Sequence, residues 1–410
     1  MQWTAWSVEA TRGDHKDGLV LVTGEATPEE LRAPVMVNLV LDRSGSMKGA
    51  PLSAAVEAAQ QLVERSQPED FLGLVLFDGV AEQRVPLTQM DARGKRQMTD
   101  ALVGIQTGRG TSLHGALELA LKGLKRTLVP GRTPRILLLT DGEPSVGPDT
   151  QEAFDALGIR LAGEKVSVHA LGLAKHYMAE ILDALTQPSG NGYEHVDGPE
   201  GLGEAMGGVV ANISGQVASE AKLRVEPAGF LALTVCHAFP SSVDQSALEV
   251  SLGDVSSDYA RRVLLAGTVT RPDWSVALHA TARENNDTRH WHIEPERVEG
   301  DSPRGRLIVG LSHELELVAE ETAAWLSLAR KELARAEQQL ESAEAHARSI
   351  VALDAEGIPV RRHLERLGDL RLAVERGEGD IPLLIRRAQS ARANTNVSQV
   401  IPLHAYRRRS

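Results

Sequence analysis

The sequence predicts an α/β unit with a doubly wound, mainly parallel sheet, an antiparallel β-sandwich and a C-terminal helical hairpin. Three observations support this organisation. Short apolar runs alternate with amphipathic stretches from residue 33 to residue 212, and short strand-like runs follow one another from 213 to 311. A helical period then extends from 312 to 393, before a polar tail at 394–410. A chain of 410 residues has room for several domains.

The α/β unit is expected to alternate strands with helices. The expected strands are 35–41, 71–77, 85–87, 135–140, 166–172 and 193–196, and the expected helices are 52–67, 95–105, 113–128, 151–163, 178–185 and 202–213. Such alternation implies crossover connections, so the sheet should be mainly parallel and covered by helices on both faces. Ligand sites in such sheets lie at the carboxyl ends of the strands.

The second part shows strands without helices between them. The expected strands are 221–225, 231–237, 248–252, 263–269, 276–282, 290–293 and 307–309. This pattern predicts an antiparallel sandwich. Residues 1–32 carry one more strand pattern, at 19–24, but are too few to bury a core of their own. Our interpretation is that 1–32 and 213–311 form one sandwich domain into which the α/β unit is inserted. The alternative is that residues 1–32 cap the edge of the α/β sheet.

The third part carries two heptad series. One is Leu326, Leu333, Leu340 and Ala347, and the other is Ala329, Ala336, Ala343 and Ile350. Together they predict an apolar seam over about four heptads. A turn signal at 354–359 and a second apolar stripe at 360–374 favour an antiparallel hairpin within the chain. Pairing of the seam between two chains is the alternative.

Composition excludes some classes of function. The formal charge of −12 argues against general binding to nucleic acid, which needs clustered Lys and Arg. The single cysteine, Cys236, cannot form an internal disulfide. No secretory signal and no stretch of about 18 apolar residues is visible in the sequence. We therefore expect no membrane span and a cytoplasmic location.

Oxygen-bearing side chains follow two of the expected buried strands. The run from Asp42 to Ser46 reads Asp-Arg-Ser-Gly-Ser and follows strand 35–41, and Asp141 follows strand 135–140. Thr111 precedes the apolar helix pattern at 113–128. These side chains offer hydroxyl and carboxylate oxygens, which are the ligands of a hard divalent cation.

This arrangement resembles the von Willebrand factor A (VWA) domain and its metal-ion-dependent adhesion site (MIDAS), in the bacterial intracellular form. The family pattern is D-x-S-x-S, then a Thr, then an Asp that closes a later strand, and the resemblance covers residues 33–212. The matching positions are Asp42, Ser44, Ser46, Thr111 and Asp141. The inserted arrangement also resembles integrin β subunits and the heavy chains of inter-α-inhibitor.

The resemblance implies a role for each of these residues. Ser44 and Ser46 would bind Mg²⁺ directly, with Mn²⁺ or Ca²⁺ as alternatives, and Thr111 would bind when the site is engaged. Asp42 and Asp141 would hold metal-bound waters and supply negative charge. The open coordination position would take an Asp or Glu from a partner protein, and loop movement would shift the last helix of the domain.

The expected function is therefore Mg²⁺-dependent protein–protein interaction, with conformational switching, and not catalysis. The resemblance implies a MoxR-type AAA+ ATPase or a multiprotein complex as the partner. The chain has no P-loop pattern of its own. Two alternatives are a metal-dependent phosphatase or phosphotransferase on the doubly wound sheet, and an extracellular adhesin.

Overall fold

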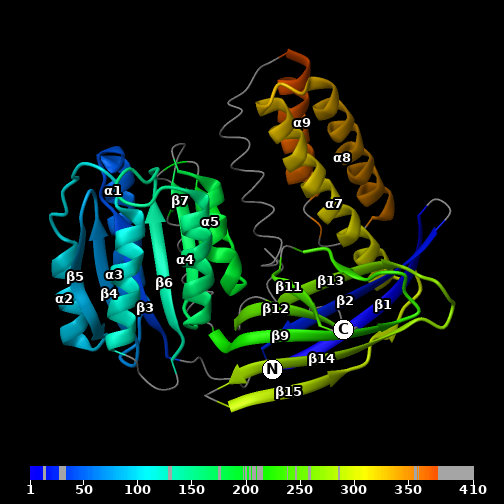
Figure 1. The fold of residues 1–410 in the computed structure, drawn as a ribbon, viewed down its shortest axis with the longest axis horizontal. Helices are drawn as coiled ribbons and strands as arrows, with labels where there is room; N and C mark the ends of the chain where they lie inside the picture. Colours follow the sequence, from blue (N-terminus) through cyan, green and yellow to red (C-terminus); the bar gives the residue numbers. More distant parts are fainter. Residues whose placement is uncertain are drawn as a thin grey trace.

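The computed structural model describes most of the chain and shows three parts (Figure 1). A six-stranded sheet with helices comes first, two five-stranded sheets pack together beside it, and helices rise from the second part. The described residues are 1–12, 15–26, 34–127, 132–173, 177–196, 198, 201–202, 205, 209, 216–237, 239–244, 247–256, 260–284, 287–354, 358 and 360–376.

The sheet of the α/β unit has the strand order β5-β4-β3-β6-β7-β8. Its strands are β3 (Met36–Asp42), β4 (Phe71–Phe77), β5 (Ala81–Gln89), β6 (Pro134–Thr140), β7 (Ser167–Leu173) and β8 (Tyr193–Val196). Neighbouring strands are parallel except for β4 and β5. β3, β6 and β7 are buried along their entire length, as expected for strands with both faces covered. The prediction of a mainly parallel sheet is confirmed.

Helices cover both faces of this sheet. Val37, Leu39 and Leu41 of β3 share a core with one set of helices, while Met36 and Val40 share a core with the other set. This division follows from the alternation of side chains along a strand. The first set is α1 (Ala50–Arg65) and α2 (Ala92–Leu102), and the second is α3 (Leu113–Arg126), α4 (Gln151–Gly163) and α5 (Ala179–Thr186). The expected helix at 202–213 lies mostly outside the described residues.

The second part consists of two sheets with the orders β10-β13-β2-β1-β16 and β11-β12-β9-β14-β15. The strands are β1 (Gln2–Arg12), β2 (His15–Glu25), β9 (Gln216–Ala228), β10 (Thr234–Val235), β11 (Ser241–Asp244), β12 (Ala247–Ser256), β13 (Arg261–Thr268), β14 (Ser275–Glu284), β15 (Asp287–Ile293) and β16 (Glu296–Arg297). All pairs are antiparallel except β1 with β16. One apolar core contains Val22 and Leu265 of the first sheet and Val225 and Leu278 of the second. The antiparallel sandwich agrees with the prediction.

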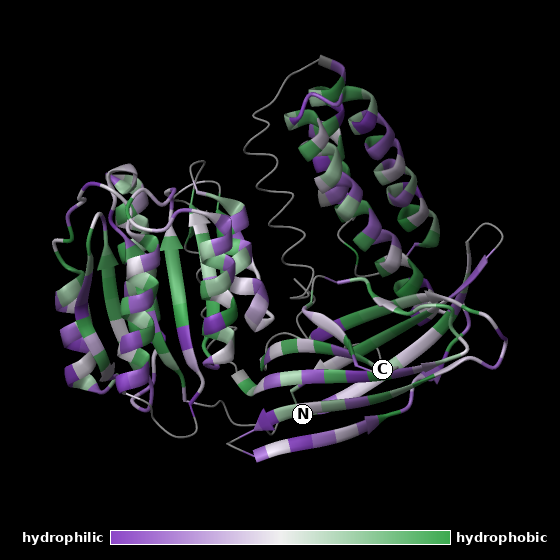
Figure 2. Cartoon of the chain, viewed as in Figure 1, coloured by the Kyte–Doolittle hydropathy of each residue, from purple (hydrophilic) through white to green (hydrophobic). Residues whose placement is uncertain are grey.

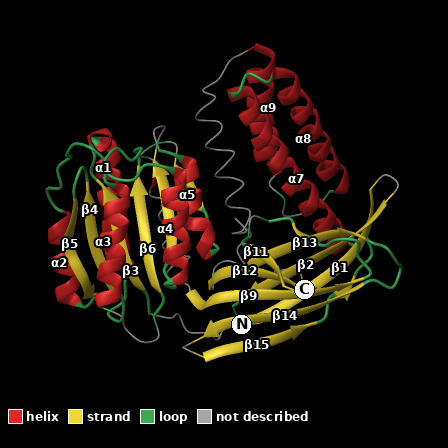
Figure 3. Ribbon diagram, in the orientation of Figure 1, coloured by secondary structure: helices red, strands yellow, loops and turns green. Residues whose placement is uncertain are grey.

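Hydropathy follows this layering. Figure 2 shows β4 and β6 as largely hydrophobic and β15, at the edge of its sheet, as largely hydrophilic. Helices are confined to the α/β unit and the C-terminal part, as Figure 3 shows for the described residues. None of the helices in these ranges is both long enough and apolar enough to cross a membrane.

The N-terminal strands lie inside the first sheet of the sandwich. β2 pairs with β1 on one side and with β13 on the other, so Leu21 lies between Trp6 and Leu264. Segments that precede and follow the α/β unit in sequence are therefore neighbours in one sheet. We propose that residues 1–32 and 213–311 form one domain, and this pairing supports it.

The expected strand at 307–309 is wrong. These residues lie in helix α7 (Pro303–Ala329), and Ser302 is the N-cap of this helix. The Ser302 hydroxyl accepts a hydrogen bond from the Gly305 N–H, and Pro303 follows at the first helical position. The apolar run at 307–309, with its β-branched residues, suggested a strand. In the structure Ile308 is buried against Leu21 and Leu264 on the outer face of the first sheet. The sandwich thus has a helix packed on that face.

The prediction of one unbroken apolar seam from Leu326 to Ile350 is also wrong. α7 ends at Ala329 and α8 (Leu333–Leu353) begins after a turn in which Lys331 adopts φ +63°. α9 (Val360–Arg376) follows, so the described C-terminal part is a bundle of three helices instead of a hairpin. The turn has no Gly or Pro, and a left-handed residue there costs roughly 1–2 kcal/mol. Antiparallel packing of α7 on α8 buries both apolar stripes within one chain, which offsets that cost.

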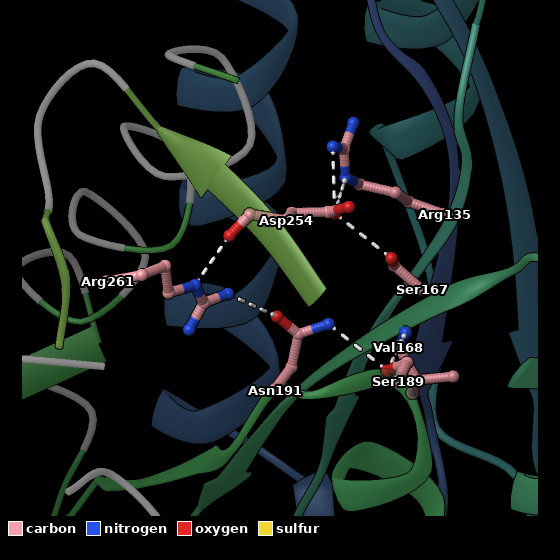
Figure 4. Close-up of polar contacts among 7 residues, drawn as sticks. All are labelled: Arg135, Ser167, Val168, Ser189, Asn191, Asp254 and Arg261. Atoms are coloured by element: carbon pink, nitrogen blue, oxygen red, sulfur yellow. Dashed lines mark hydrogen bonds and ion pairs between the residues drawn. The ribbon is translucent and has the colours of Figure 1, made fainter. Parts of the chain in front are cut away.

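A buried polar cluster joins the α/β unit to the sandwich (Figure 4). Arg135, at the start of β6, donates to the Asp254 carboxylate of β12, with Nη2 and Oδ2 3.0 Å apart. The Ser167 hydroxyl donates to the same oxygen at 3.0 Å. Arg261 donates to the backbone carbonyl of Asp254 and to the side-chain oxygen of Asn191. Both ends of the Arg135–Asp254 ion pair are almost inaccessible to solvent, with 1% and 4% of the side chains exposed.

Close backbone approach accompanies this cluster. Gly190 and Gly253 both have positive φ, and a Cβ atom on Gly253 would lie 2.5 Å from the carbonyl oxygen of Ser189. Only glycine fits such a contact. His169 is buried nearby, and burial together with the positive charge of Arg135 lowers its pKa to about 3. The imidazole is therefore neutral in the folded protein at neutral pH.

A variant that lacks residues 1–32 tests the proposed domain organisation. Removing β1 and β2 leaves β13 without its main partner, so backbone amides of β13 should lose protection in hydrogen exchange. Protection of β3 and β6 should persist, because those strands pair only within the α/β sheet. Loss of protection mainly within β3 and β6 would favour the alternative, in which residues 1–32 cap the α/β sheet.

Two leucines of α8 test the helical packing. Leu340 is 5% exposed and Leu333 is 49% exposed, although both belong to the same heptad series. Leu340→Asp should destabilise the bundle by roughly 3–5 kcal/mol, because it buries an unpaired charge. Leu333→Asp should leave stability almost unchanged. Thermal unfolding followed by circular dichroism measures both variants, and equal effects would contradict this packing.

Candidate metal centre

The predicted site residues lie where the order of strands reverses. From β3 the chain continues to β4 on one side, and later returns to β6 on the other side of β3. Asp42 is the last residue of β3, and Asp141 directly follows β6. Both strands are parallel, so their carboxyl ends open at the same edge of the sheet. Ligand sites in α/β sheets form at this kind of position.

Backbone hydrogen bonds hold the loops of this edge together. The Gly108 N–H donates to the carbonyl of Arg43, and the Gly79 N–H donates to the carbonyl of Arg109, both at 2.8 Å. The Thr111 N–H donates to the Ser145 hydroxyl at 3.0 Å, and the Ser145 N–H donates back to the Thr111 carbonyl at 3.0 Å. Four loops that are distant in sequence are therefore held to one another.

Hydroxyl and carboxylate oxygens converge between these loops. The hydroxyl oxygens of Ser44 and Ser46 are 3.0 Å apart, and the Ser46 hydroxyl donates to Oδ1 of Asp141 at 2.7 Å. Both carboxylate oxygens of Asp42 accept hydrogen bonds. Oδ1 accepts from the Ser44 N–H at 2.7 Å, and Oδ2 accepts from the Thr140 hydroxyl at 2.6 Å. These bonds fix the orientation of the Asp42 carboxylate.

Gly142 lies at the wall of this cluster. A Cβ atom there would be 3.4 Å from Oγ1 of Thr111, and 3.6 Å from both Oδ2 of Asp42 and Oγ of Ser44. The structure thus brings together all five residues predicted from the sequence. Thr140 and Gly142 also belong to the site, and sequence reasoning missed the orienting role of Thr140. Its position directly before Asp141 was the available signal.

Negative charge in the cluster is poorly compensated. Asp42 is fully buried, and burial raises its pKa to about 6, although hydrogen bonds from Thr140 and Ser44 oppose this shift. The nearby Asp141 carboxylate raises the pKa further. None of the groups that act on Asp42 in the described structure is a cation. The Arg43 side chain instead pairs with Asp78, with Nε and Oδ2 3.1 Å apart.

These residues fit a hard divalent cation. The donors are all oxygens, which suits Mg²⁺ and not the softer metals that prefer nitrogen or sulfur. A divalent ion would also supply the positive charge that stabilises the ionised form of Asp42.

An open pocket of about 810 Å³ adjoins the loops of the site. Its apolar wall includes Leu52 and Val56 of α1 and Ile105, and its polar rim includes Lys48 and Thr107. Lys48 follows the Asp-Arg-Ser-Gly-Ser run closely in sequence, so the pocket and the oxygen cluster share one loop.

Comparison with known proteins identifies the α/β unit. Residues 37–143 match the family described as the von Willebrand factor type A domain, and this segment includes every predicted site residue from Asp42 to Asp141. The chain contains a VWA domain. VWA domains typically mediate protein–protein interaction.

Solved structures extend the likeness in fold beyond the VWA domain. The chain is similar to a von Willebrand factor type A protein from Catenulispora acidiphila, with a TM-score of 0.70 and 15% identity over 95% of this chain and 96% of that one. It is also similar to the ArnB paralog VWA2 from Sulfolobus acidocaldarius, with a TM-score of 0.61 and 17% identity over 98% of each chain. At these identities the comparison concerns the fold alone.

A curated relative matches at the level of sequence. The protein sll0103 of Synechocystis sp. is 28% identical over 256 residues, which is 60% of this chain. The match spans 60% of the length of that relative as well.

Gly142→Ala tests whether the oxygen cluster encloses a metal. The backbone at Gly142 is not left-handed, and a methyl group there makes only ordinary contacts, so the fold should be unchanged. The methyl would occupy space beside three of the oxygens that a bound ion and its waters would need. Mg²⁺ affinity measured by calorimetry should therefore fall about 10- to 100-fold, the range for changes beside metal ligands. Gly163→Ala is the matched control, because a Cβ atom there meets nothing within 4 Å. Unchanged Mg²⁺ affinity in Gly142→Ala would contradict a metal centre at this position.

Proposed function

We propose that this protein is a Mg²⁺-dependent interaction module that binds an acidic residue of a partner protein through its VWA domain. The observation that carries the proposal is the convergence of five oxygen-bearing residues at the strand switch point. Among the described residues, the groups that shift the pKa of the buried Asp42 carboxylate are hydroxyls, a backbone N–H and a second carboxylate. Mn²⁺ and Ca²⁺ also accept such a ligand set.

Each residue has a distinct part in this proposal. The hydroxyls of Ser44, Ser46 and Thr111 would bind the ion directly, as in the metal-ion-dependent adhesion site that the sequence resembles. Asp42 and Asp141 would hold metal-bound waters and balance charge. When bound, the ion would offer an open position to a carboxylate of the partner. The remaining work belongs to the protein: Thr140 and the Ser44 N–H orient Asp42, and the hydrogen bonds of Ser145 position Thr111.

The adjoining pocket supports a protein partner over a small anion. The pocket is lined partly by apolar residues such as Leu52 and Ile105, and Lys48 in its lining follows Ser44 and Ser46 on the same loop. A partner with an acidic residue next to an apolar one could place the carboxylate at the ion and the apolar side chain in the pocket. We propose a MoxR-type AAA+ ATPase or a multiprotein complex as the partner. The helix whose movement would transmit binding, at 202–213, lies mostly outside the described residues.

The geometry disfavours the phosphatase alternative. A carboxylate that attacks phosphorus must reach the substrate, but Asp42 is fully buried and both of its oxygens accept hydrogen bonds. The neighbouring positions Ser44 and Ser46 carry hydroxyls and not a second carboxylate. Release of phosphate from p-nitrophenyl phosphate, dependent on both Mg²⁺ and Asp42, would reverse this preference.

Two linked experiments test the proposal. Calorimetry should show one Mg²⁺ site that is lost in Asp42→Ala and Asp141→Ala, but kept in Asp149→Ala, which removes an exposed carboxylate of the same loop. Affinity capture with the wild-type protein should then recover partners in Mg²⁺ but not in a chelator, and Asp42→Ala should recover none. Mg²⁺ binding that survives both aspartate changes would reject the site. Capture that is independent of Mg²⁺ would reject the metal-dependent interaction.

A further inference from the structure

A second group of potential metal ligands lies between helices of the C-terminal bundle. His313 and Glu316 are on α7, and His346 is on α8. One ligand atom from each residue lies within 4.8 Å of the other two. This group is made of two imidazoles and a carboxylate, unlike the all-oxygen cluster of the VWA domain.

The helices position these side chains in register. His313 and Glu316 are three residues apart on α7, so they project from the same face of that helix. α7 and α8 form an antiparallel pair joined by the turn at 330–332, which places His346 at the level of His313. Ala343 and Ala347 flank His346 and are buried, and their small side chains allow the two helices to approach closely.

The contacts within the group require a proton or a metal ion between the two imidazoles. The Nδ1 atoms of the two histidines are 3.0 Å apart, and Nε2 of His346 lies 3.2 Å from Oε2 of Glu316. Two imidazole nitrogens at this distance repel each other through their lone pairs unless a proton or a metal ion lies between them. Neutral imidazole nitrogens and a carboxylate are also a common set of zinc ligands.

The spacing suits a tetrahedral ion. Zn–N bonds of about 2.0–2.1 Å place neighbouring ligand atoms about 3.3 Å apart in a tetrahedral site. The 3.0 Å between the two Nδ1 atoms is close to this value, and one ligand atom from each of the three residues lies within 4.8 Å of the others. His346 uses a different nitrogen in each contact, so rotation of the Glu316 carboxylate or of the His346 ring is needed to direct all three ligands to one point.

Two other carboxylates of α7 pair with side chains of α9 and not with the His313 group. Glu314 of α7 is occupied by His363 of α9, with Oε1 and Nε2 2.8 Å apart. Glu321 of α7 is 1% exposed and accepts from Arg366 with both carboxylate oxygens. These pairs join α7 to α9, whereas the His313 group faces α8.

We propose that His313, Glu316 and His346 form a zinc site that links α7 to α8. Three protein ligands leave a fourth position open to solvent, which the partial exposure of His346 and Glu316, at 20% and 35%, allows. The ion would hold together the two helices whose connecting turn contains Lys331 in a left-handed conformation. The proposal is independent of the function proposed for the VWA domain.

Zinc titration of the full-length protein tests this site. Calorimetry is performed in excess Mg²⁺, and again in an Asp42→Asn, Asp141→Asn background that removes the acidic charge of the VWA site. One equivalent of Zn²⁺ should bind in both cases. His346→Ala, His313→Gln and Glu316→Gln should each lower Zn²⁺ affinity by about 100-fold or more, because loss of a ligand costs at least as much as loss of a residue that supports one.

A second measurement separates a lost ligand from a lost fold. Zn²⁺ should raise the unfolding temperature, followed through the helical signal, in the wild type but not in Glu316→Gln. Glutamine has nearly the same shape as glutamate, so this change should leave the fold intact. His290→Ala is the control, since His290 is an exposed histidine of β15, and it should behave as wild type. Equal Zn²⁺ affinity in the wild type and all three ligand variants would overturn the proposal. An equally large loss of Zn²⁺ affinity in His290→Ala would also overturn it. Absence of zinc binding would overturn it too, and would mean that the two imidazoles share a proton.

Discussion

β3 and β6 pair in parallel at the centre of the six-stranded sheet, and the position of the proposed metal centre depends on that pairing. Six pairs of residues are in register between these strands, from Met36 with Pro134 to Leu41 with Leu139. The next positions along the two strands are Asp42 and Thr140, so the Thr140 hydroxyl reaches the Asp42 carboxylate and Asp141 follows at the same edge. A change of one residue in register would separate these groups, because successive side chains point to opposite faces of a sheet.

β6 also connects the proposed metal centre to the sandwich. Its first residues include Arg135, whose guanidinium pairs with Asp254 of the sandwich, and Asp141 follows its last residue. Removal of one partner from such a buried pair costs roughly 3–5 kcal/mol, because the remaining charge has no compensation. The strand is short and fully buried, so it joins the two ends as a rigid element.

The C-terminal bundle relies on polar contacts as well as on its apolar core. Ala336, Leu340, Ala343 and Ile350 of α8 face Leu317 and Trp325 of α7 across a narrow interface. Alanine contributes little apolar area, so each buried position stabilises the pair less than a leucine would. The His313 group between α7 and α8, and the Glu321–Arg366 pair between α7 and α9, add directional contacts to this interface.

The sequence by itself determined the local features of this protein. Fully buried strands such as β3 and β6 appear as apolar runs, because that signal depends on neighbours along the chain. The candidate site residues Asp42, Ser44, Ser46, Thr111 and Asp141 were found because they match, in order, the pattern of a family that the sequence resembles. Tertiary structure decided the rest. Helix α7 covers residues 307–309 because Ile308 packs on a sheet made partly from the N-terminal strands, and α7 separates from α8 at Lys331 because antiparallel packing buries their apolar faces. Arg135 and Asp254 are 119 residues apart, so no local pattern could reveal their pairing. Burial and charge pairing across such separations arise only when the chain is folded, which is why the sequence did not predict the contacts between the parts.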